Sequence, residues 1–251
     1  MKRFAIIILV LLFNLQSVYS KESSTQSGKI SFRSKVYDWE TKKFIYTENH
    51  TEHYKDGSHI FSIIEYKDPM GKAFARKKIE FGKKRTQPDF FMEDFRTGYL
   101  DKSVLVNPST QEFAIEHRRS ESEPLKKERL KVPGLVVVDG GFDYFIRDDF
   151  DTVASGNMIK GQFLLVNRLD YFVCRVRKIA DSKFQGRDAT VLILQPENVI
   201  LRTLADKIQV TYDTKTHRLL EYIGISNLRD DAGEDFPKVK IVFEYPKGFL
   251  D

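Results

Sequence analysis

The sequence contains a single cysteine, Cys174, so the chain cannot form an intramolecular disulfide bond. A chain without disulfides must be stabilised by its hydrophobic core, and a chain of 251 residues is long enough to bury one. Beyond the first residues, no apolar run approaches the ~18–20 residues that a membrane-spanning helix needs. We therefore expect no integral membrane segment once the N-terminus is removed.

Recognisable catalytic motifs are also missing. The chain has no glycine-rich phosphate loop, no Gly-x-Ser-x-Gly elbow and no Cys-x-x-Cys pair. Positive and negative side chains are interspersed along the chain, whose formal net charge is +5, whereas a nucleic-acid site gathers Lys and Arg on one face. These absences predict a protein that is not an enzyme, carries no cofactor and does not bind nucleic acid.

The N-terminus is typical of a cleavable signal peptide. Lys2 and Arg3 precede an apolar run over 4–13, and the small residue Ser20 suits signal peptidase. We expect residues 1–20 to be the signal peptide and the polar residues 21–28 to be a flexible leader. The mature protein is then expected in the periplasm of a bacterium or outside the cell.

Most of the chain has the pattern of β-strands. Runs of β-forming residues are separated by turn signals, of which Asp56-Gly57 is a strong hairpin turn. In 208–212 and 239–245 apolar and polar residues mostly alternate, which indicates a sheet with one face on the core. The predicted strands are 29–38, 43–55, 58–67, 72–81, 90–97, 99–106, 111–118, 161–167, 171–180, 187–195, 207–213, 217–226 and 238–246. Residues 197–206 fit either a helical turn or an irregular strand.

One amphipathic helix is predicted between Asp139, as its N-cap, and Gly156 at its end. Its apolar residues recur at helical spacing, and its charged residues occupy the opposite face. The apolar face consists of Phe142, Phe145, Ile146, Phe150 and Val153. The opposite face carries Asp143, Arg147, Asp148, Asp149 and Asp151, which we expect to be solvated.

Residues 119–134 are charged and are bounded by Pro124 and Pro133, so we expect a long surface loop there. The remaining pattern predicts a mainly β protein in which 29–251 form a single domain. The expected architecture is a strongly curved antiparallel sheet of about a dozen strands, an open or half barrel, with the helix inside it or across its mouth. A two-sheet β-sandwich is the alternative.

The histidines around the Asp56-Gly57 hairpin do not form a metal site by their spacing. His50 and His53 are separated by an odd number of residues and face opposite sides, and His59 lies roughly 13 Å from His50 along their shared face. Metal ligands must lie about 2 Å from the ion. Cys174 alternates with apolar neighbours, which is typical of a buried and inert thiol.

Several segments resemble a family of exported bacterial proteins of uncharacterised function. They include Tyr-Lys-Asp-Gly at 54–57 and Asp-Phe-Arg-Thr-Gly-Tyr at 94–99, together with 66–72, 75–81, 88–90, 141–143, Phe163 and 224–228. The last third, 208–245, is similar to the end of the periplasmic carriers of outer-membrane lipoproteins. That resemblance implies a half-open β-barrel that shelters acyl chains in an apolar, aromatic-rich cavity.

The sequence contains 20 Phe and 11 Tyr, which fill β cores and also line apolar pockets. We therefore expect an exported, non-catalytic protein that binds an apolar ligand such as a lipid or acyl chain. The candidate ligand-binding residues are Phe142, Phe145 and Phe150. The alternative is a structural or protein-interaction module of the cell envelope with a packed core, an envelope protein as partner and no small ligand.

Overall fold

A computed structural model describes residues 28–204, 207–226, 228–230, 233–234, 236 and 238–251. The predicted signal peptide, 1–20, lies outside the described residues, as does the predicted leader except for Gly28, which begins the first strand. In the described part of the chain no helix is long and apolar enough to cross a membrane.

Fifteen strands of the described chain form one sheet, which is antiparallel except where β9 pairs with β10. The sheet order is β8-β7-β6-β5-β4-β3-β2-β1-β15-β14-β13-β12-β11-β10-β9, so the first and last strands pair at the centre. The first group of strands is β1 (Gly28–Asp38), β2 (Phe44–Lys55), β3 (Ser58–Lys67), β4 (Ala73–Glu80), β5 (Asp89–Asp94), β6 (Tyr99–Asn107), β7 (Glu112–Arg118) and β8 (Lys126–Lys131). The second group is β9 (Val136–Val138), β10 (Ile159–Leu165), β11 (Asp170–Phe184), β12 (Arg187–Pro196), β13 (Ile208–Asp213), β14 (Leu219–Gly224) and β15 (Val239–Glu244).

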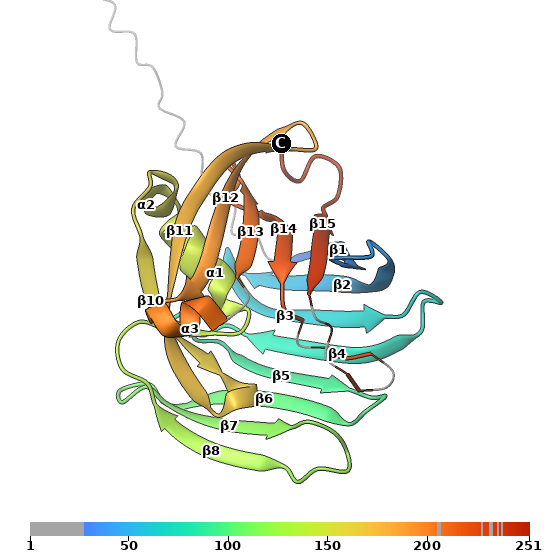
Figure 1. Ribbon diagram of the computed structural model, residues 1–251, viewed down its shortest axis with the longest axis vertical. Helices are drawn as coiled ribbons and strands as arrows, with labels where there is room; N and C mark the ends of the chain where they lie inside the picture. Colours follow the sequence, from blue (N-terminus) through green and yellow to red (C-terminus); the bar gives the residue numbers. More distant parts are fainter. Residues whose placement is uncertain (1–27, 205–206, 227, 231–232, 235, 237) are drawn as a thin grey trace, which may run out of the picture.

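The sheet is strongly curved and not closed. In Figure 1 the strands β2–β8 run across the lower part of the molecule, and β11–β15 stand at a steep angle to them. The 3-10 helix η1 (Val166–Arg168), which follows β10, contacts β6 and β7 of the other group. The expected mainly β fold, an open barrel with a helix, is therefore confirmed, and the two-sheet sandwich is wrong.

The predicted hairpin at Asp56-Gly57 is confirmed. Both residues have positive φ, 49° and 74°, as a type I′ turn requires, and Lys55 pairs with Ser58 across it. A bulge after His53 then shifts the register, so that His53 pairs with Phe61.

Residues 119–134 are only partly a loop, which corrects the sequence-based expectation. Within them 126–131 form β8, which pairs with β7 as the edge strand of the sheet. Its side chains are mostly exposed and charged, a composition that protects an edge strand from pairing with other chains. Periodicity could not reveal this strand because neither of its faces is apolar.

The predicted helix is present as two short helices, α1 (Gly141–Asp148) and α2 (Phe150–Ala154), which are separated at Asp149. Asp139 is not the N-cap: Gly140 occupies that position, and the Asp139 carboxylate pairs with Lys77 instead. The segment that fitted either a helical turn or an irregular strand contains a third helix, α3 (Val199–Leu204).

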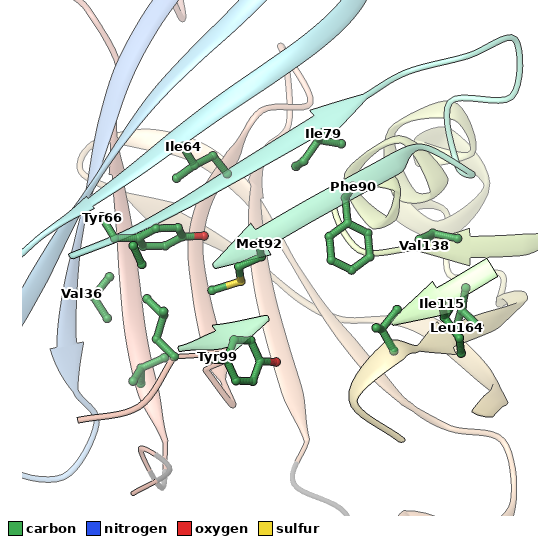
Figure 2. Close-up of a cluster of buried hydrophobic side chains, with 14 of the residues drawn as sticks. Val36, Ile64, Tyr66, Ile79, Phe90, Met92, Tyr99, Ile115, Val138 and Leu164 are labelled. Carbon is green, nitrogen blue, oxygen red and sulfur yellow. The ribbon is translucent and has the colours of Figure 1, made fainter. Parts of the chain in front are cut away.

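Two hydrophobic clusters form the core. The first lies mainly against β1–β7, and Figure 2 labels ten of its side chains, from Val36 on β1 to Leu164 on β10. The second lies between the helices α1 and α2 and the strands β10–β14, where Phe145 and Phe150 are almost completely buried. Burying the apolar helix face holds α1 and α2 against this half of the sheet.

Candidate functional site

The concave side of the sheet is not filled completely by side chains. A cavity of about 350 Å³ remains between the two groups of strands and the start of α1. Aromatic side chains from both halves of the chain line it, including Phe32, Phe90, Phe142, Phe163 and Phe243. Cavities of this size with apolar walls and a few polar groups are typical of small-ligand sites.

Strand β2 supplies a row of side chains to the cavity. Tyr46, Glu48, His50 and Glu52 are alternate residues, so they share one face of the strand, and all four line the cavity. Charged groups therefore lie on the inner wall of the sheet as well as on its outer surface.

Glu52 forms an ion pair with Arg218, which directly precedes β14. One guanidinium nitrogen of Arg218 lies 3.0 Å from each carboxylate oxygen of Glu52, and the hydroxyl of Tyr54 donates a further bond of 2.7 Å. Burial of Glu52 raises its pKa, but the charge of Arg218 and the Tyr54 bond outweigh this effect and lower the pKa. The carboxylate is therefore ionised at neutral pH.

Two further carboxylates of the lining also have cationic partners. Lys77 on β4 donates to both carboxylate oxygens of Asp139, at 2.8 and 3.1 Å. Asp143 on α1 accepts a bond of 3.0 Å from Arg147 and one of 3.2 Å from the hydroxyl of Tyr212. Asp143 thus faces other protein groups at the cavity wall rather than forming part of a fully solvated helix face.

Asp101 on β6 is buried between two partners. The Nδ1 atom of His117 lies 2.7 Å from its Oδ1 atom, and the Tyr99 hydroxyl donates to Oδ2. Asp101 and His117 meet through the pairing of β6 with β7, so no local pattern in the sequence connects them.

A serine, a glutamate and a histidine meet at the cavity wall, as in a hydrolytic triad, but their hydrogen bonds differ from those of a triad. These residues are Ser34, Glu48 and His50. The Ser34 hydroxyl and the Glu48 carboxylate both approach the Nε2 atom of His50, each at 3.2 Å. Ser34 also donates a bond of 2.6 Å to Glu48 and is completely buried. In a triad the acid orients the histidine through the opposite ring nitrogen. This arrangement does not activate a serine nucleophile.

His59 is a buried histidine of the cavity lining. Its Nδ1 atom lies 2.8 Å from the Tyr144 hydroxyl and its Nε2 atom lies 2.9 Å from the Ser62 hydroxyl. Burial lowers the pKa of His59, which is only partly compensated by the charge of Glu52. The imidazole is therefore neutral at pH 7.

The three candidate ligand-binding residues occupy different environments. Phe142 lines the cavity, whereas Phe145 and Phe150 lie in the second hydrophobic cluster, away from the lining. The polar lining residues Glu48, Glu52 and Lys77 were missed. The alternation along β2 was a usable signal for the two glutamates, although it does not reveal which face of the strand turns inward.

Cys174 is half-buried on β11, and burial raises the pKa of its thiol to about 11. A thiol with this pKa is mostly protonated at neutral pH and is a poor nucleophile. In the described residues no group of three or more His, Cys, Asp or Glu side chains is arranged to hold a metal ion.

No protein-family model and no curated protein sequence matches this chain. One similar solved structure is a β-barrel-like protein of the domain of unknown function DUF1849 from Brucella abortus, with 6% identity and a TM-score of 0.47 over 86% of this chain and 95% of that chain. A DUF1329 family protein from Desulfovibrio piger has 11% identity and a TM-score of 0.29, over 90% and 88% of the two chains. A structure described as an outer membrane lipoprotein-sorting protein domain, from Vibrio parahaemolyticus, has 10% identity and a TM-score of 0.26, over 88% of this chain and 86% of that chain. At these TM-scores none of the similarities assigns a function to the chain.

Proposed function

We propose that this protein binds an amphiphilic ligand with a long apolar part, such as a lipid or an acyl chain, in the cavity inside the curved sheet. The proposal rests on one observation: a space of about 350 Å³ persists inside a wall that is largely aromatic and aliphatic. Protein interiors are normally packed with few voids larger than a water molecule. A cavity of this volume without a ligand would forfeit packing interactions that a bound apolar chain restores.

The paired charges of the wall support the same function. Ion pairs such as Glu52–Arg218 and Lys77–Asp139 connect different elements around the cavity and keep their charged atoms compensated inside the protein. A compensated charge does not have to be solvated by water in the cavity. The wall can therefore accept an apolar chain without leaving a charge unpaired.

The proposed role is binding without catalysis. The Ser34, Glu48 and His50 cluster lacks the geometry of an activated nucleophile, and the Cys174 thiol is mostly protonated. The proposed location is the periplasm, which follows from the signal-like N-terminus and from the use of a single cysteine in a chain of this length.

The alternative of an envelope interaction module would act through a sheet edge. The edge strand β8 offers backbone groups to a partner, but it carries Lys126, Lys127, Arg129 and Lys131. Charged side chains on an edge oppose strand addition by another chain. The cavity is therefore the stronger basis for a function.

The test is organic extraction of the purified native protein followed by mass spectrometry of the extract. We expect an amphiphile in a constant ratio to protein, because a buried apolar ligand survives purification. A matched pair of variants locates it: Ile64→Trp places a larger side chain in the cavity lining, whereas Ile63→Trp changes the neighbouring residue outside the lining. Ile64→Trp should lower the recovered ligand at least ~tenfold.

The Ile63→Trp variant should retain the wild-type ligand ratio. An extract that contains no amphiphile, and added amphiphiles that fail to bind to the purified protein, would together contradict the proposed function. Equal ligand loss in both folded variants would place the ligand outside the cavity.

A further inference from the structure

Glu48 differs from the other carboxylates of the cavity in the use of its two oxygens. Its Oε2 atom accepts from the Ser34 hydroxyl at 2.6 Å and lies 3.2 Å from the Nε2 atom of His50. Its Oε1 atom has no hydrogen-bond partner among the described residues. The side chain lines the cavity and only 7% of the residue is exposed.

The remaining carboxylates of the lining are saturated. Each has a hydrogen bond on both of its oxygens from neighbouring side chains or backbone. These four residues are Glu52, Asp101, Asp139 and Asp143. Glu48 is thus the one acid of the described lining that retains an unused acceptor oxygen.

The Glu48 carboxylate is ionised in spite of its burial. Burial raises its pKa, but the hydrogen bonds and charge of His50, the Ser34 bond and the charge of Lys77 together bring the pKa below its usual value. The ammonium group of Lys77 is itself bound to both oxygens of Asp139, which compensates its charge. An anionic ligand group beside Glu48 would therefore meet an ionised carboxylate and a cation that is already paired.

A second unpaired polar group lies beside Glu48. Tyr66 on β3 is the direct cross-strand partner of Glu48 on β2, so the two side chains share the inner face. Tyr66 lines the cavity with 4% of its surface exposed, and its hydroxyl has no hydrogen-bond partner in the described part of the chain. Figure 2 shows this hydroxyl pointing from β3 toward Met92, another lining residue.

We propose that Glu48 Oε1 and the Tyr66 hydroxyl form the polar subsite of the cavity, and that the subsite selects an amphiphile whose polar end donates hydrogen bonds, a primary amine or an alcohol, over one that ends in a carboxylate. This inference rests on the proposed function, because it names the chemistry of the ligand's polar end. Polar groups inside proteins are nearly always hydrogen-bonded to protein or to water, and in the proposed complex the ligand supplies the donor to Glu48.

The physical basis of the selection is charge and hydrogen-bond polarity. An ammonium or hydroxyl group donates to Oε1, and an alcohol oxygen can also accept from Tyr66. A carboxylate has no proton to donate at neutral pH, and inside the protein its charge repels that of Glu48 more strongly than in water. The apolar chain contributes equally in the three cases, so the polar end decides the ranking.

The test compares binding of decylamine, decanol and decanoate to the purified, delipidated wild-type protein at pH 7. We expect decylamine and decanol to bind at least ~tenfold more tightly than decanoate. In the variant Glu48→Gln this preference should fall below about threefold, because the repelling charge is removed. The matched control Glu65→Gln removes a carboxylate from β3, outside the lining, and should preserve the wild-type ranking.

A second variant, Tyr66→Phe, removes the hydroxyl without changing the charge of the cavity. It should weaken decanol binding by roughly threefold or more. The wild-type ranking and this variant test the subsite even if Glu48→Gln does not fold. Decanoate binding as tightly as decylamine, or a preference that persists in folded Glu48→Gln, would overturn the subsite while leaving the binding function intact. Failure of all three probes to bind would instead contradict the proposed function itself.

Discussion

Arg218 and Glu52 are 166 positions apart in the sequence, yet one guanidinium nitrogen of Arg218 lies 3.0 Å from both carboxylate oxygens of Glu52. Glu52 lies on β2 and Arg218 directly precedes β14, and β1 and β15 separate these strands in the sheet. The ion pair therefore reaches across the concave face and connects the two groups of strands at the cavity wall. The side chains of both residues are nearly buried.

Removing one partner of the Glu52–Arg218 pair should lower the stability of the protein. We expect Arg218→Met to lower the free energy of unfolding by about 3–5 kcal/mol, because it leaves the Glu52 carboxylate buried without its cation. Chemical denaturation measures the change. The control Lys183→Met breaks the exposed pair with Asp188 and should change stability by less than about 0.5 kcal/mol. Similar losses in both variants would show that the Glu52–Arg218 pair is not protected from solvent.

His59 should make the stability of the protein dependent on pH below neutrality. Burial lowers its pKa in the folded state from the usual value of 6.5, so below that pH the unfolded chain takes up a proton that the folded chain does not. The contribution of neutral His59 is thus present above pH 6.5 and is lost as the pH falls through the folded-state pKa. In denaturation experiments between pH 7 and pH 5, His59→Gln should show a shallower loss of stability than the wild type. An unchanged slope would assign the pH dependence to other groups.

The apolar face of the two helices should dominate their contribution to stability. Phe145 and Phe150 are 1% and 2% exposed, so replacement of either by Ala should cost roughly 3–5 kcal/mol. Replacement of the exposed Asp148 or Asp149 by Ala should change stability by less than about 0.5 kcal/mol. Chemical denaturation of the four variants checks this. Small and equal effects in both sets would mean that the helices do not pack through this face.

Limited trypsin digestion should cut first between residues 119 and 131. This segment contains exposed Lys and Arg side chains and forms the edge of the sheet, where one side of the strand is unpaired. The two fragments should elute together in size-exclusion chromatography, because β1 pairs with β15 and Val138 donates a backbone bond to Thr86. Separation into two folded fragments would contradict the single-domain prediction.

Elements whose residues carry a local pattern could be predicted from the sequence, whereas contacts between distant residues could not. The strands with an alternating apolar face, such as β13 and β15, and the helix residues Phe145 and Phe150 were predicted correctly, because burial of one face imposes a period on the sequence. Strand β8 was missed because it has no buried face, and Asp139 was misassigned as a cap because its partner, Lys77, lies 62 positions away.

By itself the sequence determined the fold class, since the spacing of turns and the period of the strands depend only on neighbouring residues. The alternation along β2 likewise placed Glu48, His50 and Glu52 on one face. Only the tertiary structure decided that this face is the inner one, because its partners around the cavity, such as Arg218, are far away in the sequence. The cavity, with the Oε1 atom of Glu48 in its wall, arises from the curvature of the sheet. The curvature brings together residues that no local pattern of the sequence connects.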